Sequence, residues 1–378
     1  MTTNLSGKAV IAGIGSTKFG ALPGRTTVSM NVEAIRKALK DAGIEKDMVD
    51  ALFVKCPTSK FELMYGQKVA EAVAMQPRMG GVWDSGGSTN VMLIATAAMA
   101  IEAGQCDIAV ITFADNPKSG SAASYSRPRG DDALYGWFAT LAGYAMITRR
   151  HMGELGTPRE ALGAVAVAAR KHGAQNPNAQ LRKELTLDEY MGLPMMVAPF
   201  CRDDCTLVSD GAAAIVVMSE KRAKELGVRK PVPVLGFGFG QTSWEVAQRP
   251  DMTSTRAKIA AETAFKMAGL KPKDMDVAQI YDCFTITALM TLEDYGFAKK
   301  GQIADFVKGG NIEIGGELPM NTSGGLLSET GMPGMQLVQE AVRQMRGEAN
   351  LQVKNAKHCI VSNQGGVMHT HATLILGQ

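Results

Sequence analysis

The sequence predicts an α/β protein built from two similar halves. An apolar segment at residues 8–15 is followed by apolar residues at helical spacing, and this helix is expected to end at Gly43. The same order recurs at residues 233–240, with a helix that ends at Gly269. Strands that alternate with helices favour mostly parallel sheets covered by helices on both faces. A chain of 378 residues exceeds one ordinary domain, which agrees with two halves.

Matching positions in the two halves support a duplication. Gly43 corresponds to Gly269 and Asp50 to Asp276, and the two pairs keep the same offset. Similarity at one long offset indicates a duplicated domain, because a solenoid repeats about every 20–50 residues. The two helices are predicted by helical spacing in each half, at Val28, Val32, Ile35 and Leu39 and at Ala261, Ala264, Phe265 and Ala268. Further strands are expected at residues 51–54, 108–112, 212–218, 277–280, 358–362 and 373–376.

Composition narrows the functional classes. The formal net charge of +3 is too small to indicate a nucleic-acid or membrane-surface partner. The six cysteines are scattered without metal-type pairing, which predicts reduced thiols, no metal site and a cytoplasmic protein. Residues 1–8 lack the apolar core of a signal peptide, and no run of about 18 apolar residues could span a bilayer.

The stretch 83–107 indicates a tight turn that enters a buried helix. From Val91 to Ile101 the only hydroxyl is Thr96, and a helix that is apolar on every side must be enclosed by protein. The turn therefore carries a helix N-terminus into the interior, where free N–H groups favour negative charge. Enzymes place a thiolate in such a setting because its pKa falls there. Here the chain has Gly87, followed by Ser88.

This pattern resembles the thiolase superfamily, nearest to the sterol-carrier-protein type and its lipid-transfer-like relatives. Those enzymes read Cys-Ser-Thr-Gly or Cys-Ala-Ser-Gly where this chain has residues 87–90, and the resemblance runs from Ala9 to Leu376. It implies the five-layer α-β-α-β-α thiolase fold, in which duplicated βαβαβαββ halves enclose two buried helices. One of these helices should begin at Gly87 and the other near Thr330.

The resemblance also implies a division of the chain into three parts. Residues 1–115 together with 203–225 would form the N-terminal thiolase half, and residues 226–378 the C-terminal half. Residues 116–202 would form a loop domain that shapes the acyl-CoA tunnel and makes dimer contacts. Its basic residues could meet CoA phosphates, although for any single one we favour a solvated charge, namely Arg127, Arg129, Arg149, Arg150, Arg170 and Lys171.

In the family, the cysteine at the position of Gly87 accepts the acyl group, and a glycine cannot do so. Ser88 is the nearest hydroxyl, but it lies one residue on and faces about 100° away around the helix. A serine nucleophile also needs a base. Ser88 is therefore either a substitute catalytic residue or the cap of the buried helix, and we favour the cap.

The second candidate loop is Tyr281-Asp282-Cys283-Phe284, directly after a predicted strand. It resembles the His-Asp-Cys-Phe of sterol-carrier-type thiolases, whose leading residue holds a donor on the thioester oxyanion. Tyr281 can donate through its hydroxyl, and in lyase-like relatives a tyrosine at this position is implicated in retro-aldol chemistry. Cys283 is an alternative nucleophile, although active thiolases of this type carry a cysteine there too. All three residues, Tyr281, Asp282 and Cys283, are predicted to be catalytic.

Two further loops complete the predicted centre. Residues 321–334 resemble the family's Asn-Pro-Ser-Gly-Gly-Leu-Ile-Ser-Lys-Gly-His-Pro-x-Gly stretch, but the general-base histidine is replaced by Gly331. Residues 362–373 resemble the family's Cys-x-Gly-Gly-Gly-x-Gly loop, and Asn363 stands at the position of its cysteine. His369 and His371 are additions that point opposite ways on an extended segment, each either a catalytic or a structural histidine. The predicted substrate-binding residues are Gly87, Gly325, Gly331, Asn363, Gly365 and Gly366.

These residues predict an atypical thiolase-like enzyme that makes or breaks a carbon–carbon bond beside the carbonyl of a CoA thioester. The Gly365-Gly366 backbone, Tyr281 and the helix end would bind the oxyanion, and His369, His371 or Tyr281 would be the base. With nucleophile and base substituted, retro-aldol or decarboxylation-like cleavage fits better than thiolysis. The rival interpretation is a catalytically silent subunit that binds acyl-CoA or lipid.

The resemblance implies partners as well. Relatives of this kind often act with a small zinc-ribbon/OB-fold subunit that binds acyl-CoA, and the family forms homodimers through the edges of its central sheets. We expect acyl-CoA as the substrate, no covalently bound cofactor, and no nucleic acid or membrane partner. The glycine-rich strand ends lack the spacing of a dinucleotide site.

Overall fold

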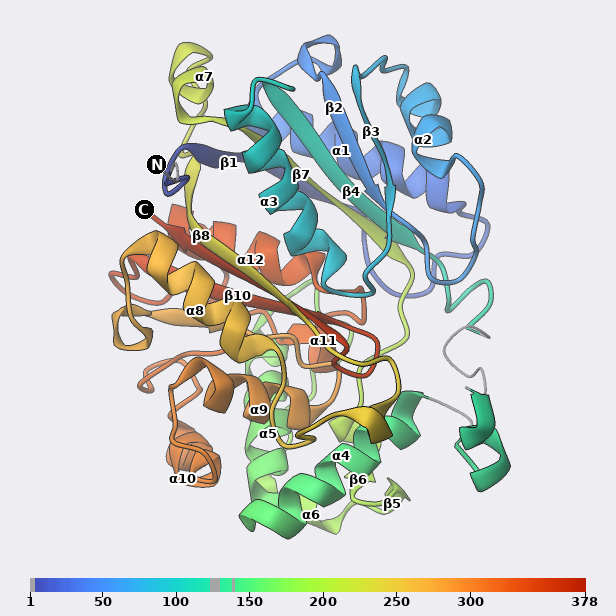
Figure 1. The fold of residues 1–378 in the computed structure, drawn as a ribbon, viewed down its shortest axis with the longest axis vertical. Coiled ribbons are helices and arrows are strands. Elements are labelled where there is room, and N and C mark those ends of the chain that lie inside the picture. The colour runs from blue at the N-terminus through green and yellow to red at the C-terminus, as the bar shows by residue number, and fades with distance from the viewer. Residues whose placement is uncertain (1–3, 123–129, 138–139) are drawn as a thin grey trace.

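The computed structural model describes residues 4–122, 130–137 and 140–378, and a nine-stranded sheet runs through it (Figure 1). The strand order is β3-β2-β4-β7-β1-β8-β11-β10-β9. The first half contributes β1 (Ala9–Ser16), β2 (Ala51–Lys55), β3 (Met79–Trp83), β4 (Ile108–Asp115) and β7 (Gly211–Ser219). The second half contributes β8 (Val232–Gln241), β9 (Val277–Gln279), β10 (His358–Gly365) and β11 (Thr370–Gly377). The halves join at a short β1–β8 pairing, in which Val10 lies opposite Pro233 and Ile11 opposite Val232.

The expectation of mostly parallel sheets was wrong. Among the described strands of this sheet, three pairs are parallel: β2–β3, β2–β4 and β9–β10. Five pairs are antiparallel: β1–β7, β1–β8, β4–β7, β8–β11 and β10–β11. After β4 the chain makes a long excursion and returns as β7, antiparallel between β4 and β1. In the second half a tight turn joins β10 directly to β11. A helical crossover produces parallel neighbours, whereas a tight turn or a long return does not require them.

The helices form layers around and between the two halves of the sheet. Helix α1 (Thr27–Ala42) covers the first half beside α2 (Tyr65–Val73), and α8 (Ala257–Ala268) with α9 (Thr285–Tyr295) covers the second. Helix α3 (Thr89–Glu102) contacts β4 and β7 on one side and β10 and β11 on the other. Helix α12 (Met335–Arg346) likewise contacts strands of both halves. This is the predicted thiolase arrangement, with α3 and α12 as its buried helices.

The duplication is visible in matching residues. Gly43 and Gly269 end α1 and α8 in the left-handed conformation, with φ of 69° and 70°. The Asp50 carboxylate accepts hydrogen bonds from the amides of residues 107 and 108, at 3.0 and 2.9 Å. The Asp276 carboxylate accepts from the amides of residues 357 and 358, at 2.7 and 2.9 Å. Each aspartate thus fixes the start of the next parallel strand in its own half.

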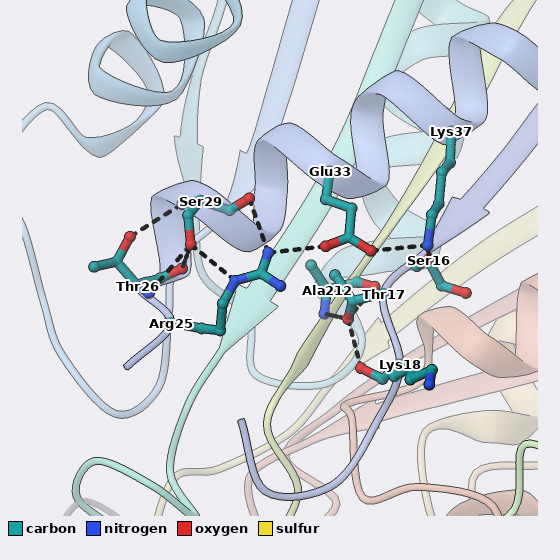
Figure 2. A network of polar contacts seen from close by, with 9 residues as sticks. All are labelled: Ser16, Thr17, Lys18, Arg25, Thr26, Ser29, Glu33, Lys37 and Ala212. Atoms are coloured by element: carbon teal, nitrogen blue, oxygen red, sulfur yellow. Dashed lines mark hydrogen bonds and ion pairs between the residues drawn. The ribbon is translucent and has the colours of Figure 1, made fainter. Parts of the chain in front are cut away.

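The start of α1 shows how local polar contacts set a helix boundary (Figure 2). Thr26 accepts a hydrogen bond from the Ser29 amide at 3.1 Å, and the Ser29 hydroxyl accepts from the Thr26 amide at 3.2 Å. This reciprocal cap satisfies two N–H groups that the helix leaves unpaired. Further along, Glu33 lies between Arg25 and Lys37, both 2.8 Å away, and these cations lower the pKa of its carboxyl group.

A helical segment between β4 and β7 gathers at one end of the molecule, green in Figure 1. It contains α4 (Thr140–Leu155), α5 (Arg159–Gln175) and α6 (Leu187–Gly192), followed by the hairpin of β5 (Met195–Val197) and β6 (Phe200–Cys201). A buried pair, His151 and Glu293, joins α4 to α9 at 3.2 Å. The remaining helices are α7 (Glu220–Glu225), α10 (Ile303–Val307) and α11 (Gly325–Ser328). Short 3₁₀ turns occupy Lys46–Met48, Gly130–Tyr135, Arg202–Asp204, Val246–Gln248, Pro272–Asp274 and Lys308–Gly310.

Over the described ranges, we found no helix with the length and apolar character needed to cross a bilayer.

Candidate active site

The turn that enters α3 is held by its own side chains. The Asp84 carboxylate accepts a hydrogen bond from the Gly86 amide at 2.9 Å, and the Thr89 hydroxyl donates to the Gly86 carbonyl at 2.7 Å. Gly86 adopts φ of 63°, and a Cβ on it would lie 2.6 Å from the Gly365 Cα. Glycine is therefore required here both by conformation and by contact with the β10–β11 turn.

Tyr281 occupies the space that a side chain at position 87 would need. A Cβ built on Gly87 would overlap the Gln364 carbonyl oxygen and the Tyr281 hydroxyl oxygen, and it would lie 2.6 Å from Tyr281 Cζ. Real Cβ atoms do not approach other atoms so closely, so the tyrosine ring and the Gln364 carbonyl together leave no space for a cysteine at 87 in the observed geometry. The Tyr281 backbone is fixed in turn, because its amide donates to the Ser362 hydroxyl at 3.2 Å.

Asp282 connects the second loop to the third. Its Oδ1 accepts from the Leu326 amide at 2.7 Å, and its Oδ2 has no hydrogen-bond partner among the described residues. Burial raises the pKa of this carboxyl to about 7, because the charged form loses its hydration. A Cβ on Gly325 would collide with the carboxylate, so the glycine lets α11 begin directly against Asp282. This contact ties the Tyr281 loop to residues 321–334.

Cys283 lies in a buried hydrogen-bonded cluster. Its thiol donates to the Tyr144 hydroxyl at 3.4 Å and accepts from Gln364 Nε2 at 3.5 Å. Burial raises the pKa of the thiol to about 12, which keeps it protonated. A protonated, buried thiol is a poor nucleophile, so this geometry argues against Cys283 as a relocated acyl acceptor.

The third loop leaves no space for a base at position 331. A Cβ on Gly331 would overlap the Leu207 carbonyl, which lies directly against the Gly331 Cα, and the Gly331 amide donates to the Ser209 hydroxyl at 3.0 Å. The loop is also braced by Asn321, whose side chain accepts from the Ile280 amide at 2.7 Å and donates to its carbonyl at 2.8 Å. The substitution of histidine by glycine is thus matched by the path of the neighbouring chain.

The fourth loop closes on the first. Asn363 Nδ2 donates to the Gly87 carbonyl at 3.3 Å, while Asn363 Oδ1 is buried without a partner in the described part of the chain. A Cβ on Gly365 would meet the Thr370 hydroxyl at 2.6 Å, and Gly366 adopts φ of 62°. The predicted convergence of the four loops is therefore confirmed at the level of backbone contacts.

The structure gives both added histidines structural contacts. His369 Nδ1 accepts from the Val367 amide at 2.8 Å, and Nε2 lies 2.6 Å from the Trp244 carbonyl, to which it must donate. His371 lies 2.9 Å from the Tyr295 hydroxyl through Nε2, and burial lowers the pKa of its imidazole to about 3. The two rings thus have different partners, Trp244 for His369 and Tyr295 for His371. Of the two alternatives, these contacts favour the structural histidine over the base.

Ser88 is directed away from Tyr281. Its hydroxyl donates to the Ser85 carbonyl at 2.7 Å and lies 2.7 Å from the Thr370 hydroxyl. It makes no side-chain cap for α3, so the capping interpretation was wrong. The reason is that Ser88 already has helical backbone angles (φ −68°, ψ −18°), whereas a capping residue is extended.

Three residues at this centre were absent from the sequence prediction. Tyr144 enters from α4, stacks on Phe284 with ring centroids 4.3 Å apart, and donates to the Gly366 carbonyl at 2.6 Å. Gln364 contacts Cys283 from β10, and Arg249 donates to the Val367 carbonyl. Gln364 lay inside a motif and could have been included. Tyr144 and Arg249 come from segments with no recognisable pattern.

Metal-ligating side chains and the basic residues predicted to meet CoA phosphates are the remaining features of the predicted site. Within residues 4–122, 130–137 and 140–378, no group of three or more His, Cys, Asp or Glu side chains is arranged to hold a metal ion. Of the basic residues predicted for CoA phosphates, Arg127 and Arg129 lie outside the described residues. Arg150 pairs with Glu154 at 2.5 Å, and Arg170 pairs with Asp203 at 2.5 Å.

The chain is similar to known proteins along its whole length. Residues 238–378 match the family model described as thiolase C-terminal domain-like. A steroid side-chain-cleaving aldolase of Thermomonospora curvata is 34% identical over 396 residues, which cover 99% of this chain and 98% of that protein. The chain belongs to the thiolase superfamily. The family predicted from the four loops is therefore confirmed.

The chain is also similar to a lyase and to the solved structure of an aldolase. A 17-hydroxy-3-oxo-4-pregnene-20-carboxyl-CoA lyase of Mycobacterium tuberculosis is 34% identical, with 99% of this chain and all of that protein covered. A solved structure titled Ltp2-ChsH2(DUF35) aldolase superposes with a TM-score of 0.89 at 33% identity and covers 99% of both chains. This thiolase-superfamily chain thus resembles carbon–carbon lyases over its whole length.

Proposed function

We propose that this chain is a retro-aldol lyase that cleaves the carbon–carbon bond beside the carbonyl of a β-hydroxyacyl-CoA. The observation that carries this proposal is the Tyr281 side chain against Gly87, in the space where a thiolase has its acyl-accepting cysteine. Thiolysis needs a nucleophile at that point, whereas retro-aldol cleavage needs proton transfer and enolate stabilisation. The full-length similarity to an aldolase and a CoA lyase supports the same choice.

In the proposed reaction Tyr281 relays one proton. In its phenolate form, the Tyr281 oxygen takes the proton of the substrate β-hydroxyl as the bond between the α- and β-carbons breaks. The β-carbon becomes a carbonyl, and the electron pair of the broken bond passes to the thioester as an enolate. Tyr281 then gives the same proton to the α-carbon, which yields a shorter acyl-CoA and restores the phenolate. The proton balance closes without His369 or His371, whose ring contacts are described above.

Main-chain groups would stabilise the enolate. The N-terminus of α3 begins at the Gly87 turn, and the partial positive charge of a helix N-terminus favours an anion. The Gly365-Gly366 backbone packs against the same turn. Asn363 holds the Gly87 carbonyl, and Asp282 holds the loop at residues 325–326, so these two side chains position backbone rather than substrate.

The proposed function includes a small partner subunit. The solved relative is titled as an aldolase with a DUF35 component, which supports a small zinc-ribbon/OB-fold subunit as the partner of this chain. We further propose the division into residues 1–115 with 203–225, 116–202 and 226–378, in which the middle part borders the acyl-CoA tunnel. The names of the relatives make a steroid side-chain CoA thioester the first substrate to test.

A homodimer belongs to the same proposal. Strand β3 is the terminal strand of the sheet, so one edge of its backbone is open to pair with a second copy. Next to it, the segment 61–64 exposes apolar side chains, with Phe61 76% and Leu63 75% exposed. Edge pairing would cover both features, and sedimentation of the purified chain would measure the dimer directly.

Product analysis tests the proposed reaction. The purified chain, alone and with its small subunit, is incubated with a β-hydroxyacyl-CoA, and the products are identified by mass spectrometry. We expect a ketone and an acyl-CoA shortened by the cleaved fragment, with no requirement for free CoA. Cleavage that depends on added CoA would indicate thiolysis. Binding without turnover in the presence of the subunit would favour the acyl-CoA-binding scaffold instead.

A further inference from the structure

The turn between β10 and β11 is held by three different parts of the chain. The Gly365 carbonyl accepts from the His369 amide within the turn, at 2.9 Å. The Gly366 carbonyl accepts from the Tyr144 hydroxyl of α4, and the Val367 carbonyl accepts from Arg249 Nη2. Three consecutive carbonyl groups are therefore fixed in direction, and the orientation of the peptide groups that face the Gly87 turn follows from them.

Arg249 is unusual because its charge is buried and no acid pairs with it among the described residues. The residue is only 9% exposed, and no ion pair joins it to a carboxylate in the part of the chain that the structure describes. Its Nε has no hydrogen-bond partner there either. The nearest acid in sequence, Asp251, instead accepts from the Thr253 amide and hydroxyl, both at 2.7 Å. Burial also lowers the pKa of the Arg249 guanidinium, as expected for a desolvated cation.

A buried, unpaired charge destabilises a fold, so its presence calls for a gain elsewhere. A hydrogen bond to a carbonyl could be made by a neutral donor such as glutamine, and it does not by itself require a cation. One source of such a gain is a state of the protein in which negative charge is present near Arg249.

The position of Arg249 identifies that state. It bonds to Val367, two residues from Gly365, and Gly365 lies against Gly86 in the turn that contains the candidate centre. The other clamp of the β10–β11 turn, Tyr144, also accepts from the Cys283 thiol, next to Tyr281 in sequence. Arg249 thus lies behind one wall of the proposed centre, separated from it by the turn that it holds.

We propose that Arg249 is a positioning residue that, together with Tyr144, orients the β10–β11 turn and makes this wall of the centre positive, so that the site favours an anionic enolate over the neutral thioester. The inference deepens the proposed lyase function, on which the identity of the enolate rests. In a region of low effective dielectric a single cation acts over several ångströms without touching the anion.

Ligand preference tests the proposal without any turnover. Carboxymethyl-CoA carries a carboxylate in place of the enolate, and ethyl-CoA is a neutral thioether of similar size. Isothermal titration with both ligands gives the preference of the full chain for the anion. We expect Arg249→Met to reduce that preference about tenfold and Arg249→Lys to retain most of it. A purely structural role would weaken both ligands equally, and an unchanged preference in Arg249→Met would overturn the proposal.

Control variants separate charge from shape. Arg150→Met removes a cation that is exposed and paired with Glu154, and it should leave the preference unchanged. Tyr144→Phe removes a clamp without changing the charge, and it should weaken both ligands while the preference stays the same. If Arg249→Met does not fold, Arg249→Gln provides the same loss of charge with a donor retained.

Proton exchange provides a second, independent readout. Propionyl-CoA in D₂O exchanges its α-protons when an enzyme stabilises the enolate, and NMR follows this exchange without a retro-aldol substrate. We expect Arg249→Met to exchange about tenfold more slowly than the unmodified chain. Failure of carbon–carbon cleavage with retained, Arg249-dependent exchange would sink only the lyase proposal. Cleavage and exchange that do not depend on Arg249 would sink only this inference.

Discussion

The two buried helices, α3 and α12, occupy equivalent layers but are held in different ways. Helix α3 is mostly apolar: its buried Asn90 donates to the Pro333 carbonyl, and a surface pair of Lys8 and Glu102 lies at its end. Helix α12 buries polar side chains: Gln339 donates to the Gly15 carbonyl at 2.8 Å, and Arg346 donates to the Ala12 carbonyl at 2.9 Å. Duplication therefore preserved the positions of the helices, while hydrogen bonds between the halves are concentrated on the second one.

The two halves also contribute different kinds of groups to the candidate centre. The turn before α3 contributes main chain at Gly86 and Gly87, and its Ser88 hydroxyl is directed elsewhere. The C-terminal half contributes side chains, with Tyr281 against Gly87 and Asp282 against residues 325–326. Under the proposed lyase function, the half that carries the nucleophile in thiolases would supply backbone groups, and the chemistry would come from side chains of the other half.

The largest expected effect concerns the chemical step. Tyr281→Phe should reduce turnover of a β-hydroxyacyl-CoA by about 10²–10⁴-fold, the usual contribution of a proton-transfer group. Ser88→Ala, the matched variant in the other half, should change turnover only slightly because Ser88 bonds to Ser85 and Thr370. Steady-state kinetics of both variants measures the difference. A severe loss of turnover in Ser88→Ala would contradict the proposal and indicate a catalytic residue in the first half.

The next effect tests how the two helices are held. Arg346→Met leaves the Asp41 carboxylate unpaired, where the two now lie 2.7 Å apart, and removes bonds to two carbonyls. We expect the free energy of unfolding to fall by about 2–3 kcal/mol, mainly because the Ala12 and Lys230 carbonyls lose a charged donor, whereas the Asp41 side chain is 31% exposed and regains hydration. Lys8→Ala breaks only a half-exposed pair and should cost less than about 1 kcal/mol. Urea denaturation that gives equal losses would contradict the comparison.

Asp282 should make stability depend on pH. Its folded-state pKa of about 7 lies above the ordinary value of 3.8, so the folded protein holds the proton more tightly. The stability from this group is complete at pH below about 4 and is lost as the pH rises towards 7, by at most about 1.4 kcal/mol per pH unit. Asp282→Asn should flatten that part of the profile in thermal unfolding.

Two other carboxyls have to be controlled in that experiment. Burial also raises the pKa of Glu329 to about 7 and that of Asp294 above its ordinary value, both in the same direction. The Asp282→Asn profile should therefore keep a residual slope that Glu329→Gln reduces. If the stability of Asp282→Asn falls between pH 4 and 7 as steeply as that of the unmodified chain, the raised pKa of Asp282 is contradicted.

The smallest expected effect concerns the packing at position 87. Gly87→Ala places a methyl group against the Tyr281 ring and should destabilise the protein by about 1–3 kcal/mol, as in other overpacked cores. Gly153→Ala in α4 has open space around its Cβ and should be neutral or stabilising. Calorimetry of Gly87→Ala with Tyr281→Ala should show a smaller cost for the methyl group, because the ring is gone.

Some elements were predictable because their signal is local. Apolar runs and C-terminal glycines placed β1, α1, β8 and α8 to within about two residues, a normal error for element ends. Strand β3 was not predicted, since Met79–Trp83 contains two glycines and lies at the sheet edge, where apolar alternation is weak. The antiparallel returns of β7 and β11 were also missed, because strand direction depends on distant connections.

The candidate site divides in the same way. The glycine turns and the Tyr281 loop were recognisable as motifs, so their meeting at one place could be predicted. The roles of His369 and His371 could not, because Trp244 and Tyr295 come from distant segments. Arg249 lies in no motif, and what distinguishes it from an ordinary surface arginine is its burial with no acid beside it in the described part of the chain.

The sequence by itself determined the duplicated halves, the turns that need glycine, and the absence of a cysteine and a histidine at two expected positions. These are properties of short segments, governed by backbone conformation and apolar spacing. Only the tertiary structure decided that Tyr281 lies against Gly87, that Leu207 excludes a side chain at Gly331, and which side chains clamp the β10–β11 turn. Such contacts join residues far apart in the chain, and close packing rather than local preference selects them.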